Sequence, residues 1–321
     1  MSLNNMLNKI NKLFLYFNGS KFIYGPHGKL LLRSIEHYWC LDSVTMPNYN
    51  VFLISNDSIS DMFKTLNNNL TDIPFGLAMI EESKMLWNQS ILPIESKIIS
   101  HKVGKVVLFE DISNSKTLFY KKHKDRKIWW RKLAKNPSRF GITEVKSVKN
   151  KKIVNIEAKF SFGNIIVETI TYNPDINTEF LQSGREIDNL QAVEHTAALD
   201  WGCLALLCDG FDMEVNQIFI NPKIAPYKIT YLINTSNSDD DSMRQNMIQL
   251  VLYLNKLLRA KGFSTILSCN INSVKTFVPF IIEVNEKSLK TGMVHVLSQI
   301  TALSEEIHMS NLSKYFKAYC N

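Results

Sequence analysis

Ile73-Pro74-Phe75-Gly76-Leu77-Ala78-Met79-Ile80 is the stretch that decides the fold of the first part of the chain. It is a short apolar run that reads as a β-strand, as does Val106 to Phe109. Between Ile153 and Tyr172 the apolar positions alternate along two segments separated by Gly163-Asn164, which is the signature of a β-hairpin. Together these segments predict an antiparallel sheet in the first two-thirds of the chain.

The last third of the chain follows a different pattern. A strand is expected at Tyr227 to Ile233, then a helix whose apolar stripe runs from Met243 to Leu258 and which ends at Gly262, and then a strand at Phe263 to Leu267. This order predicts a βαβ unit with parallel strands and a right-handed crossover.

Strands at Phe277 to Val284 and Met293 to Leu297 and a helix at Asn311 to Tyr319 complete a small α/β layer domain. The expected division of the chain is residues 1–20 as a leader or first helix, 21–220 as the sheet domain, and 221–321 as the α/β domain.

The composition is that of a globular protein without a membrane partner. The chain has 321 residues, 45% of them hydrophobic, which is enough to bury two ordinary cores. Its most apolar stretch, Ala197 to Phe211, is interrupted by Asp200 and Asp209 and is too short to span a bilayer. The five cysteines form no CxxC pair, and no His/Cys cluster has zinc-ligand spacing. We therefore expect a reducing compartment, no metal site and no cofactor.

The first 35 residues are basic and contain no acidic residue before Glu36. The apolar residues of this segment fall at helical spacing: Leu7, Ile10, Leu13, Phe14 and Phe17. A basic amphipathic start is typical of a mitochondrial presequence. An ordinary first helix fits equally well, because presequences usually prefer arginine and this segment carries mostly lysine. Both interpretations stay open for residues 1–20.

The net charge of +7 is concentrated in one segment. Lys121 to Lys152 holds thirteen lysines and arginines against two acidic residues, a net charge of +11, so the rest of the chain carries −4. A basic segment in a mildly acidic protein is the electrostatic footprint of a surface that binds a polyanion. The candidate residues for contacts to this polyanion are Lys121, Lys122, Lys124, Arg126, Lys127, Arg131, Lys132, Lys135, Lys149, Lys151 and Lys152.

Most of these residues fall in one predicted helix, which ends before Pro137 and also carries Trp129 and Trp130. We interpret the tryptophans as core anchors rather than as platforms on which bases stack. For the lysines, a merely solvated face and a face that contacts phosphates fit the pattern equally. Any binding should be independent of base sequence, because lysines meet phosphates as point charges and no base-reading module is present.

Four stretches carry a resemblance to a known family. They are Tyr24-Gly25-Pro26-His27-Gly28, residues 73–80, Leu199-Asp200-Trp201-Gly202, and Ala225-Pro226-Tyr227-Lys228-Ile229. In this order they resemble motifs 1, 2 and 3 and the first anticodon-domain strand of the class II aminoacyl-tRNA synthetases of the glycyl and prolyl type. The resemblance implies an α+β fold class, with a class II aminoacyl-tRNA-synthetase-like antiparallel sheet domain followed by an anticodon-binding-like α/β layer domain.

The same resemblance implies where ATP would be held, because motifs 2 and 3 of those enzymes each supply an arginine to the nucleotide. The motif 2 arginine position falls on Met85, the glutamate two positions later on Trp87, and the motif 3 arginine position on Trp201. No arginine lies within ten residues of either arginine position. A shift of one residue would place Lys84 in motif 2, but lysine lacks the planar fork of a guanidinium. We therefore expect no catalytic residues and no independent enzyme activity.

Four further stretches point to a non-catalytic branch of this fold. They are Trp129-Trp130-Arg131-Lys132-Leu133-Ala134 with Pro137-Ser138 and Phe140, then Leu199 to Phe211, then Ile224 to Lys228, and finally Lys290 to Val296 with Ile307-His308. They resemble the accessory (processivity) subunits of mitochondrial DNA polymerase gamma. Only Thr45 to Asp72 separates the first two motifs, which leaves little room for the helical insertion of the vertebrate members. The shorter insect-type subunit is therefore the better match.

This resemblance implies a protein that binds the DNA polymerase gamma catalytic subunit, mainly through its C-terminal domain. It also implies tighter binding of the holoenzyme to primer-template or other double-stranded DNA, and a location in the mitochondrial matrix, at the nucleoid. A 1:1 complex with the catalytic subunit is expected, and a homodimer stays open. The expected partner-binding residues, on exposed edges, are Phe277, Gly292, Met293 and His295. In the alternative interpretation Phe277 and Met293 are core residues.

Two other functions are consistent with the same residues. A divergent synthetase-like enzyme would need an ATP site, and a tRNA- or RNA-binding module would use the basic segment without any polymerase. Trp201 is expected to pack inside the emptied adenine pocket rather than to contact a ligand.

Overall fold

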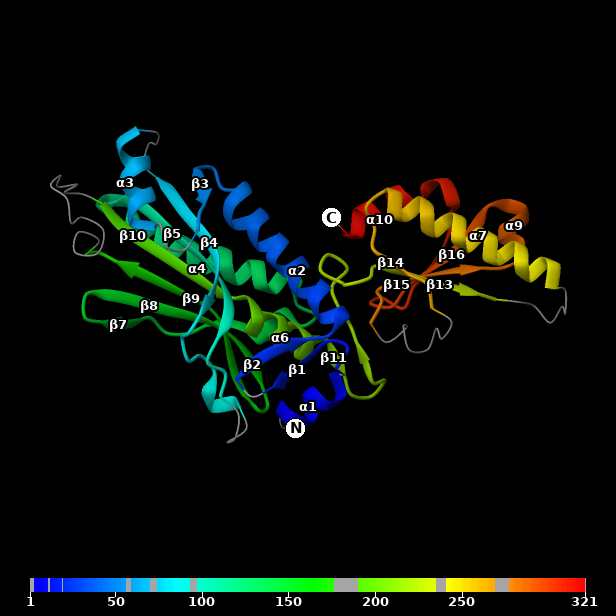
Figure 1. Cartoon of the computed structure of the whole chain (residues 1–321), viewed down its shortest axis with the longest axis horizontal. Coiled ribbons are helices and arrows are strands. Elements are labelled where there is room, and N and C mark those ends of the chain that lie inside the picture. Colours follow the sequence, from blue (N-terminus) through cyan, green and yellow to red (C-terminus); the bar gives the residue numbers. More distant parts are fainter. Residues whose placement is uncertain are drawn as a thin grey trace. The chain divides into compact units, whose positions relative to one another are not determined.

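The structure is a computed structural model and describes residues 3–10, 12–18, 20–55, 59–69, 74–92, 97–175, 190–234, 241–268 and 277–320. The chain divides into two compact units (Figure 1): unit 1 is Met1–Gly25 with Ile35–Asp209, and unit 2 is Pro26–Ser34 with Gly210–Asn321. The division therefore falls at Gly210 rather than at the expected residue 221. None of the described helices is both long enough and apolar enough to cross a membrane.

Unit 1 is built on an eight-stranded sheet with the order β3-β4-β5-β10-β9-β8-β6, and β7 pairs with β8. The strands are β3 (Asn50–Leu53), β4 (Phe75–Ser83), β5 (His101–Asp111), β6 (Phe140–Ile142), β7 (Lys146–Val148), β8 (Lys151–Phe160), β9 (Gly163–Asn173) and β10 (Leu190–Ala198). Each pair of neighbours runs antiparallel except β3 and β4, which are parallel. The predicted antiparallel sheet is confirmed, and residues 75–80 of the opening stretch lie in β4.

The hairpin predicted from the alternating pattern is formed by β8 and β9, which are joined by a turn at Ser161-Phe162, and Gly163-Asn164 begin β9. The register shifts in the middle of this hairpin, because β9 has one extra residue between Ile166 and Glu168, a β-bulge. As a result Val167 and Glu168, which are adjacent in sequence, are both fully buried. The bulge therefore brings Glu168 into the protein interior, where α4 covers the sheet.

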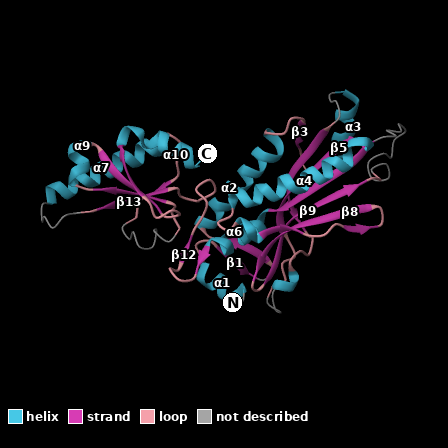
Figure 2. Cartoon of the chain, turned by 180° about the vertical axis from the view of Figure 1, so that it is seen from behind, coloured by secondary structure: helices cyan, strands magenta, loops and turns pink. Residues whose placement is uncertain are grey.

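Several helices of unit 1 surround this sheet (Figure 2). They are α1 (Leu3–Ile10), the π-helical η1 (Leu41–Thr45), α3 (Ile59–Asn69), η3 (Gln89–Ile91), α4 (Ile112–Leu133), η4 (Pro137–Arg139) and α6 (Leu199–Gly210). Helix α2 (Pro26–Cys40) is divided between the units, because Pro26–Ser34 belong to unit 2 and Ile35–Cys40 to unit 1. The longest helix of unit 1, α4, contacts β5, β6, β8, β9 and β10. A Cβ on Gly202 of α6 would overlap the Trp130 ring, so a glycine here lets α6 approach α4 closely.

The helical spacing of the apolar residues predicted an N-terminal helix that extends to Phe17, but the helix is shorter. Helix α1 ends at Ile10, and Phe17 lies in β1 (Leu15–Asn18), which pairs with β2 (Lys21–Tyr24). Leu3, Met6 and Ile10 are buried, so α1 packs into unit 1 as an ordinary helix does.

Unit 2 contains a five-stranded sheet of order β14-β13-β15-β16-β17 and a separate pair, β11 (Phe211–Asp212) with β12 (Gln217–Ile218). The sheet strands are β13 (Ile229–Ile233), β14 (Thr265–Ile266), β15 (Phe280–Val284), β16 (Met293–Ser298) and β17 (Ser304–His308), and the helices are α7 (Asp241–Ala260), α9 (Glu286–Thr291), η5 (Met309–Asn311) and α10 (Leu312–Cys320). Strands β13 and β14 are parallel and joined through α7, which confirms the predicted βαβ unit.

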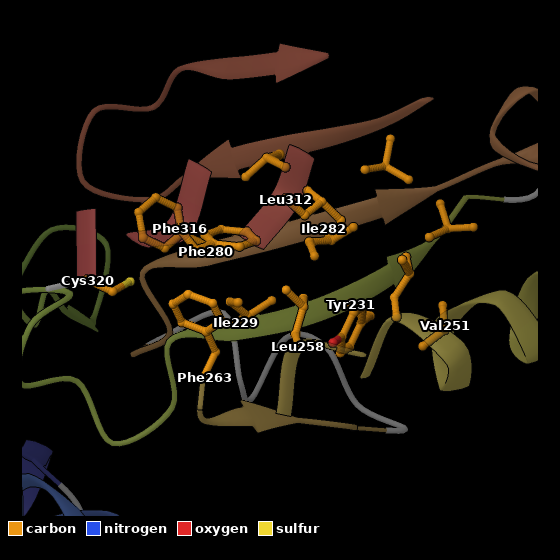
Figure 3. Close-up of a cluster of buried hydrophobic side chains, with 14 of the residues drawn as sticks. Ile229, Tyr231, Val251, Leu258, Phe263, Phe280, Ile282, Leu312, Phe316 and Cys320 are labelled. Carbon is orange, nitrogen blue, oxygen red and sulfur yellow. The ribbon is translucent and has the colours of Figure 1, made fainter. Parts of the chain in front are cut away.

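The core of unit 2 lies between its sheet and the helices α7 and α10 (Figure 3). Its buried side chains include Ile229, Tyr231, Val251, Leu258, Phe263, Phe280, Ile282, Leu312, Phe316 and Cys320. These residues alternate along the strands and recur at helical spacing in α7, which is the pattern that allowed the βαβ unit to be predicted.

Candidate nucleic-acid interface

The basic helix α4 has one fully buried stripe. Its buried residues are Ser115, Phe119, His123, Arg126, Trp129, Trp130 and Leu133, spaced by three or four positions apart from the adjacent tryptophans. This spacing places them on one helical face, against the sheet. Phe119 contacts Tyr172 of β9, with ring centroids 5.9 Å apart. One charged side chain of the basic segment, Arg126, therefore points into the protein.

Arg126 is 1% exposed and is held by two carboxylates. Its Nε donates to Oε1 of Glu168 at 2.7 Å, and its Nη1 donates to Oδ2 of Asp42 at 2.6 Å. The prediction that Arg126 contacts DNA is therefore wrong. An exposed helical arginine and a buried one look alike in a lysine-rich segment, and here the buried position is stabilised by an ion pair.

Glu168 is the centre of this buried network. Its Oε2 accepts a hydrogen bond from Nε1 of Trp130 at 2.6 Å, and its Oε1 lies 3.1 Å from Nδ1 of His195. Burial alone would raise the pKa of Glu168, but Arg126 and His195 lower it to about 2. Burial lowers the pKa of His195 to about 4 despite the neighbouring carboxylate. The network therefore holds an ionised glutamate and a neutral histidine at pH 7, and it fixes α4 to β9 and β10.

The lysines on the opposite side of α4 face solvent. Lys121, Lys124 and Lys132 are exposed, and Lys127 and Lys122 are half-buried. Lys135 is exposed just after the end of α4. Lys121 and Lys132 are eleven residues apart, about 16 Å along a helix axis, which matches roughly five nucleotides of one DNA strand. Ile128 is exposed between them and Tyr120 directly before them, 45% and 49% respectively. This face has the charge and the length to follow a phosphate backbone.

The other candidate residues lie in different surroundings. Arg131 is half-buried, and its Nε donates to the carbonyl oxygen of Phe140 at 2.8 Å. Lys149 is exposed in the turn between β7 and β8, where its φ is 53°, and Lys151 and Lys152 are half-buried in β8. Sequence reasoning missed Lys116, which is exposed on α4 before the basic segment and lies two turns before Lys124. Helical spacing back from Lys124 would have found it.

The two tryptophans of α4 are core residues, as interpreted from the sequence. Trp129 is 6% exposed and Trp130 fully buried, and their rings meet edge-on with centroids 4.7 Å apart. The Arg126 guanidinium lies 4.5 Å from the centroid of the Trp129 ring. They anchor α4 in the core of unit 1 rather than stack on bases.

The positions that would bind ATP in a synthetase are occupied by uncharged side chains. Met85 is 54% exposed in the irregular segment after β4. Trp87 and Trp201 both contact the ring of His101, with centroids 5.5 and 6.5 Å apart, and Trp201 also packs edge-on against Phe22 at 5.0 Å. Trp201 is fully buried, as expected of a packing residue. Burial lowers the pKa of His101 to about 4, although Glu82 opposes this shift.

The described residues offer no metal centre, since nowhere among them do three or more His, Cys, Asp or Glu side chains come together in a group that could hold an ion.

The four expected partner-binding residues do not lie on one exposed edge. Phe277 is 6% exposed, and its ring lies 4.5 Å from that of His27, so the core interpretation holds for it and the prediction of an exposed edge is wrong there. Met293 and His295 are half-buried on β16, next to the edge strand β17. Gly292 ends α9 at φ 72°, and a Cβ on it would come within 2.7 Å of Nε2 of His308, which favours glycine.

No protein-family model matches the chain. The chain is similar to a protein from Drosophila melanogaster named DNA polymerase subunit gamma-2, mitochondrial, with 23% identity over 61% of each chain. It is also similar to DNA polymerase subunit gamma-2 of Mus musculus, with 24% identity over 77% of this chain and 60% of the relative. The corresponding mitochondrial protein of Xenopus laevis is 23% identical over 77% of this chain and 59% of the relative. The chain thus spans about three-fifths of the length of these curated relatives. The resemblance to a polymerase gamma accessory subunit, indicated by the motifs, is confirmed.

Proposed function

We propose that this chain is a non-catalytic accessory subunit of mitochondrial DNA polymerase gamma, which binds the catalytic subunit and raises its affinity for DNA and its processivity. The observation that carries the proposal is the row of exposed lysines on α4, in a chain similar to proteins named polymerase subunits. The buried Arg126–Glu168 ion pair holds this helix against the sheet. The proposal includes a mitochondrial location, in the matrix at the nucleoid, because two of those relatives are named mitochondrial.

The physical basis of processivity in this proposal is additive. Each lysine that neutralises a phosphate releases condensed counterions, and each such contact changes the slope of log affinity against log salt by about 0.9. A subunit that presents three or four such lysines beside the polymerase adds their contribution to the polymerase's own. The complex then dissociates from primer-template more slowly, so more nucleotides are added in each binding event.

The absence of enzyme activity is part of the proposal. It is supported by Trp87 and Trp201, which fill the space around His101 where a synthetase-like protein would need cationic side chains for ATP. The sheet of unit 1, antiparallel apart from its β3–β4 edge, and the βαβ unit of unit 2 are consistent with a synthetase-like domain and an anticodon-binding-like domain.

We place the surface for the catalytic subunit on unit 2, around Gly292, Met293 and His295. Gly292 directly precedes β16, and Met293 and His295 lie in it, next to the edge strand β17. Strand β17 has an unpaired edge within the described sheet, and its residues Ser304 to Glu306 are exposed. A 1:1 complex is proposed.

Primer extension by the cognate catalytic subunit, with and without this chain, tests the proposal. We expect longer products with the chain present, and a gain that shrinks as salt rises. A chain that binds tRNA far more tightly than primer-template at matched salt, and that leaves product length unchanged, would instead be an RNA-binding module. Amino-acid-dependent ATP–pyrophosphate exchange that is lost in Lys84→Ala would identify a synthetase-like enzyme.

A further inference from the structure

A cavity of about 450 Å³ lies beside α4, between the helix and the segment that follows α2. The helix contributes Lys121, Lys122 and Lys132 to its wall, and the segment contributes Met46 and Tyr49. All of these residues belong to unit 1. The cavity has the size of a small-molecule site, and the row of lysines proposed to follow DNA runs along its rim.

Cationic side chains outnumber carboxylates in the wall of this cavity. Within the described part of the chain, no carboxylate lies within ion-pair distance of Nζ of Lys122, which is instead 5.5 Å from the centroid of the Tyr49 ring. Burial lowers the pKa of Lys122, and the Arg126 guanidinium lowers it further. Two carboxylates also line the cavity, but Asp42 is engaged by Arg126, which leaves Asp125 beside Lys121 and Lys122. A bound anion would compensate this excess of charge.

The Tyr49 hydroxyl is a second polar group that a ligand could bind. Its hydroxyl is buried and makes no hydrogen bond with any part of the chain that the structure describes. Burial raises the pKa of this phenol, and Asp125 and Asp42 add to the shift, so the hydroxyl keeps its proton and can donate. A buried polar atom without a partner in a native structure calls for an explanation, and an anion oxygen would accept this hydrogen bond.

Part of the cavity wall is apolar. Met46 is 73% exposed and Ile128 is 45% exposed, and Leu118 and Pro47 lie in the same wall. A single phosphate ion would occupy only a small part of the volume, so a ligand that fills the cavity has a second, uncharged portion that covers these side chains.

We propose that this cavity binds a nucleotide, with its phosphate on Lys121, Lys122 and the Tyr49 hydroxyl and its nucleoside against Met46 and Ile128. Free nucleotides and the terminal nucleotide of a nucleic-acid strand share this chemistry. The proposal goes beyond the accessory role and does not rest on it. The cavity and the cationic side chains in its wall exist whether or not a polymerase binds.

Fluorescence anisotropy of the full chain with N-methylanthraniloyl-dATP at low salt tests the site. Lys122→Ala should weaken binding about tenfold, the loss expected for one charge-assisted hydrogen bond. Tyr49→Phe should weaken it by a smaller factor and leaves the ring in place. The matched control is Lys124→Ala, which removes an exposed lysine of the same helix that does not line the cavity, and it should change the affinity less than twofold.

Equal losses in Lys122→Ala and Lys124→Ala would overturn the proposal, because they would show only general attraction to a basic surface. Displacement of the probe by inorganic phosphate as readily as by dATP would also overturn it. Displacement by a 5′-phosphorylated oligonucleotide but not by its 5′-hydroxyl form would support the site and identify a strand end as the ligand. Displacement by dATP alone would support it and identify a free nucleotide. None of these outcomes depends on primer extension.

Discussion

Arg126 of α4 and Glu168 of β9 form an ion pair, 2.7 Å between Nε and Oε1, in which both side chains are almost completely buried. The pair joins the helix that carries the exposed lysines to the centre of the sheet, and Trp130 reinforces it through its own hydrogen bond to Glu168. The basic surface is thus presented on a helix whose position is fixed from inside the protein.

Glu168→Gln should destabilise the protein by about 3 kcal/mol, because it leaves the Arg126 guanidinium buried with Asp42 as its one remaining charged partner. Urea denaturation followed by circular dichroism measures the change. Glu157→Gln is the matched control, since Glu157 lies on the neighbouring strand β8 and bonds Asn164 at the surface. A loss for Glu168→Gln no larger than that for Glu157→Gln would contradict the role given to the buried pair.

Acid should destabilise unit 1 through its buried histidines. Burial lowers the pKa of His101, His123 and His195 to about 4 from the ordinary 6.5. The unfolded chain binds these protons below pH 6.5 and the folded chain only near pH 4, so stability is fully present above pH 6.5 and falls as the pH drops towards 4. The largest slope is about 1.4 kcal/mol per pH unit for each histidine.

Between pH 7 and pH 5 the buried His101 should cost the natural protein roughly 2 kcal/mol of stability. This part of the loss should be absent in His101→Phe, which lacks the buried base. Urea midpoints at the two pH values give the measurement, and the comparison is His37→Gln, which replaces an exposed histidine. If both variants lose stability with the same pH dependence as the natural protein, His101 does not stay neutral in the folded state.

Replacing two exposed lysines of α4 and one that directly follows the helix should lower the salt dependence of DNA binding. The triple variant Lys116→Ala, Lys124→Ala and Lys135→Ala removes charges outside the nucleotide cavity. It should reduce the slope of log affinity against log salt by about 3 units if each lysine contacts one phosphate. Binding of a duplex by the whole chain, measured from 50 to 200 mM salt, gives the slope.

The control for that variant is Lys256→Ala, Lys261→Ala and Lys317→Ala, which removes the same charge from exposed positions of unit 2. An equal fall in slope for both triple variants would mean that DNA responds to net charge and not to the α4 face.

Trp201→Arg should not restore an ATP site. Trp201 is fully buried against Phe22 and His101, so a guanidinium there would lose its hydration and should destabilise the protein by more than about 3 kcal/mol. Trp87→Arg, at the half-buried position on the other contact to His101, should be tolerated better. A stable Trp201→Arg variant that binds ATP would contradict the view that this space is filled by packing.

Local patterns were sufficient to predict several elements. The alternation around Gly163-Asn164 predicted the β8–β9 hairpin, and the apolar stripe up to Leu258 predicted α7 and the parallel pairing of β13 with β14. These signals are strong because the side-chain period is set by the backbone geometry within the element itself. The N-terminal helix was overestimated because Phe14 and Phe17 keep helical spacing by chance while the chain turns into β1.

The interior of the candidate site could not be predicted in the same way. The partner of Arg126 is Glu168, 42 positions later, and the bulge that buries Glu168 depends on the pairing register of β8 and β9. One signal was available, since Arg126 falls between His123 and Trp130 on the stripe of three- and four-residue spacing. Phe277 was misplaced for a similar reason, because its burial comes from a contact with His27, which is distant in sequence.

The most direct test of the central claim is the rate at which the polymerase gamma catalytic subunit dissociates from a primer-template in the presence of excess trap DNA. We predict that this chain slows dissociation, that the slowing weakens as salt rises, and that the α4 triple lysine variant still binds the catalytic subunit but slows dissociation less. An unchanged dissociation rate, with the chain shown to be bound to the catalytic subunit, would contradict the account.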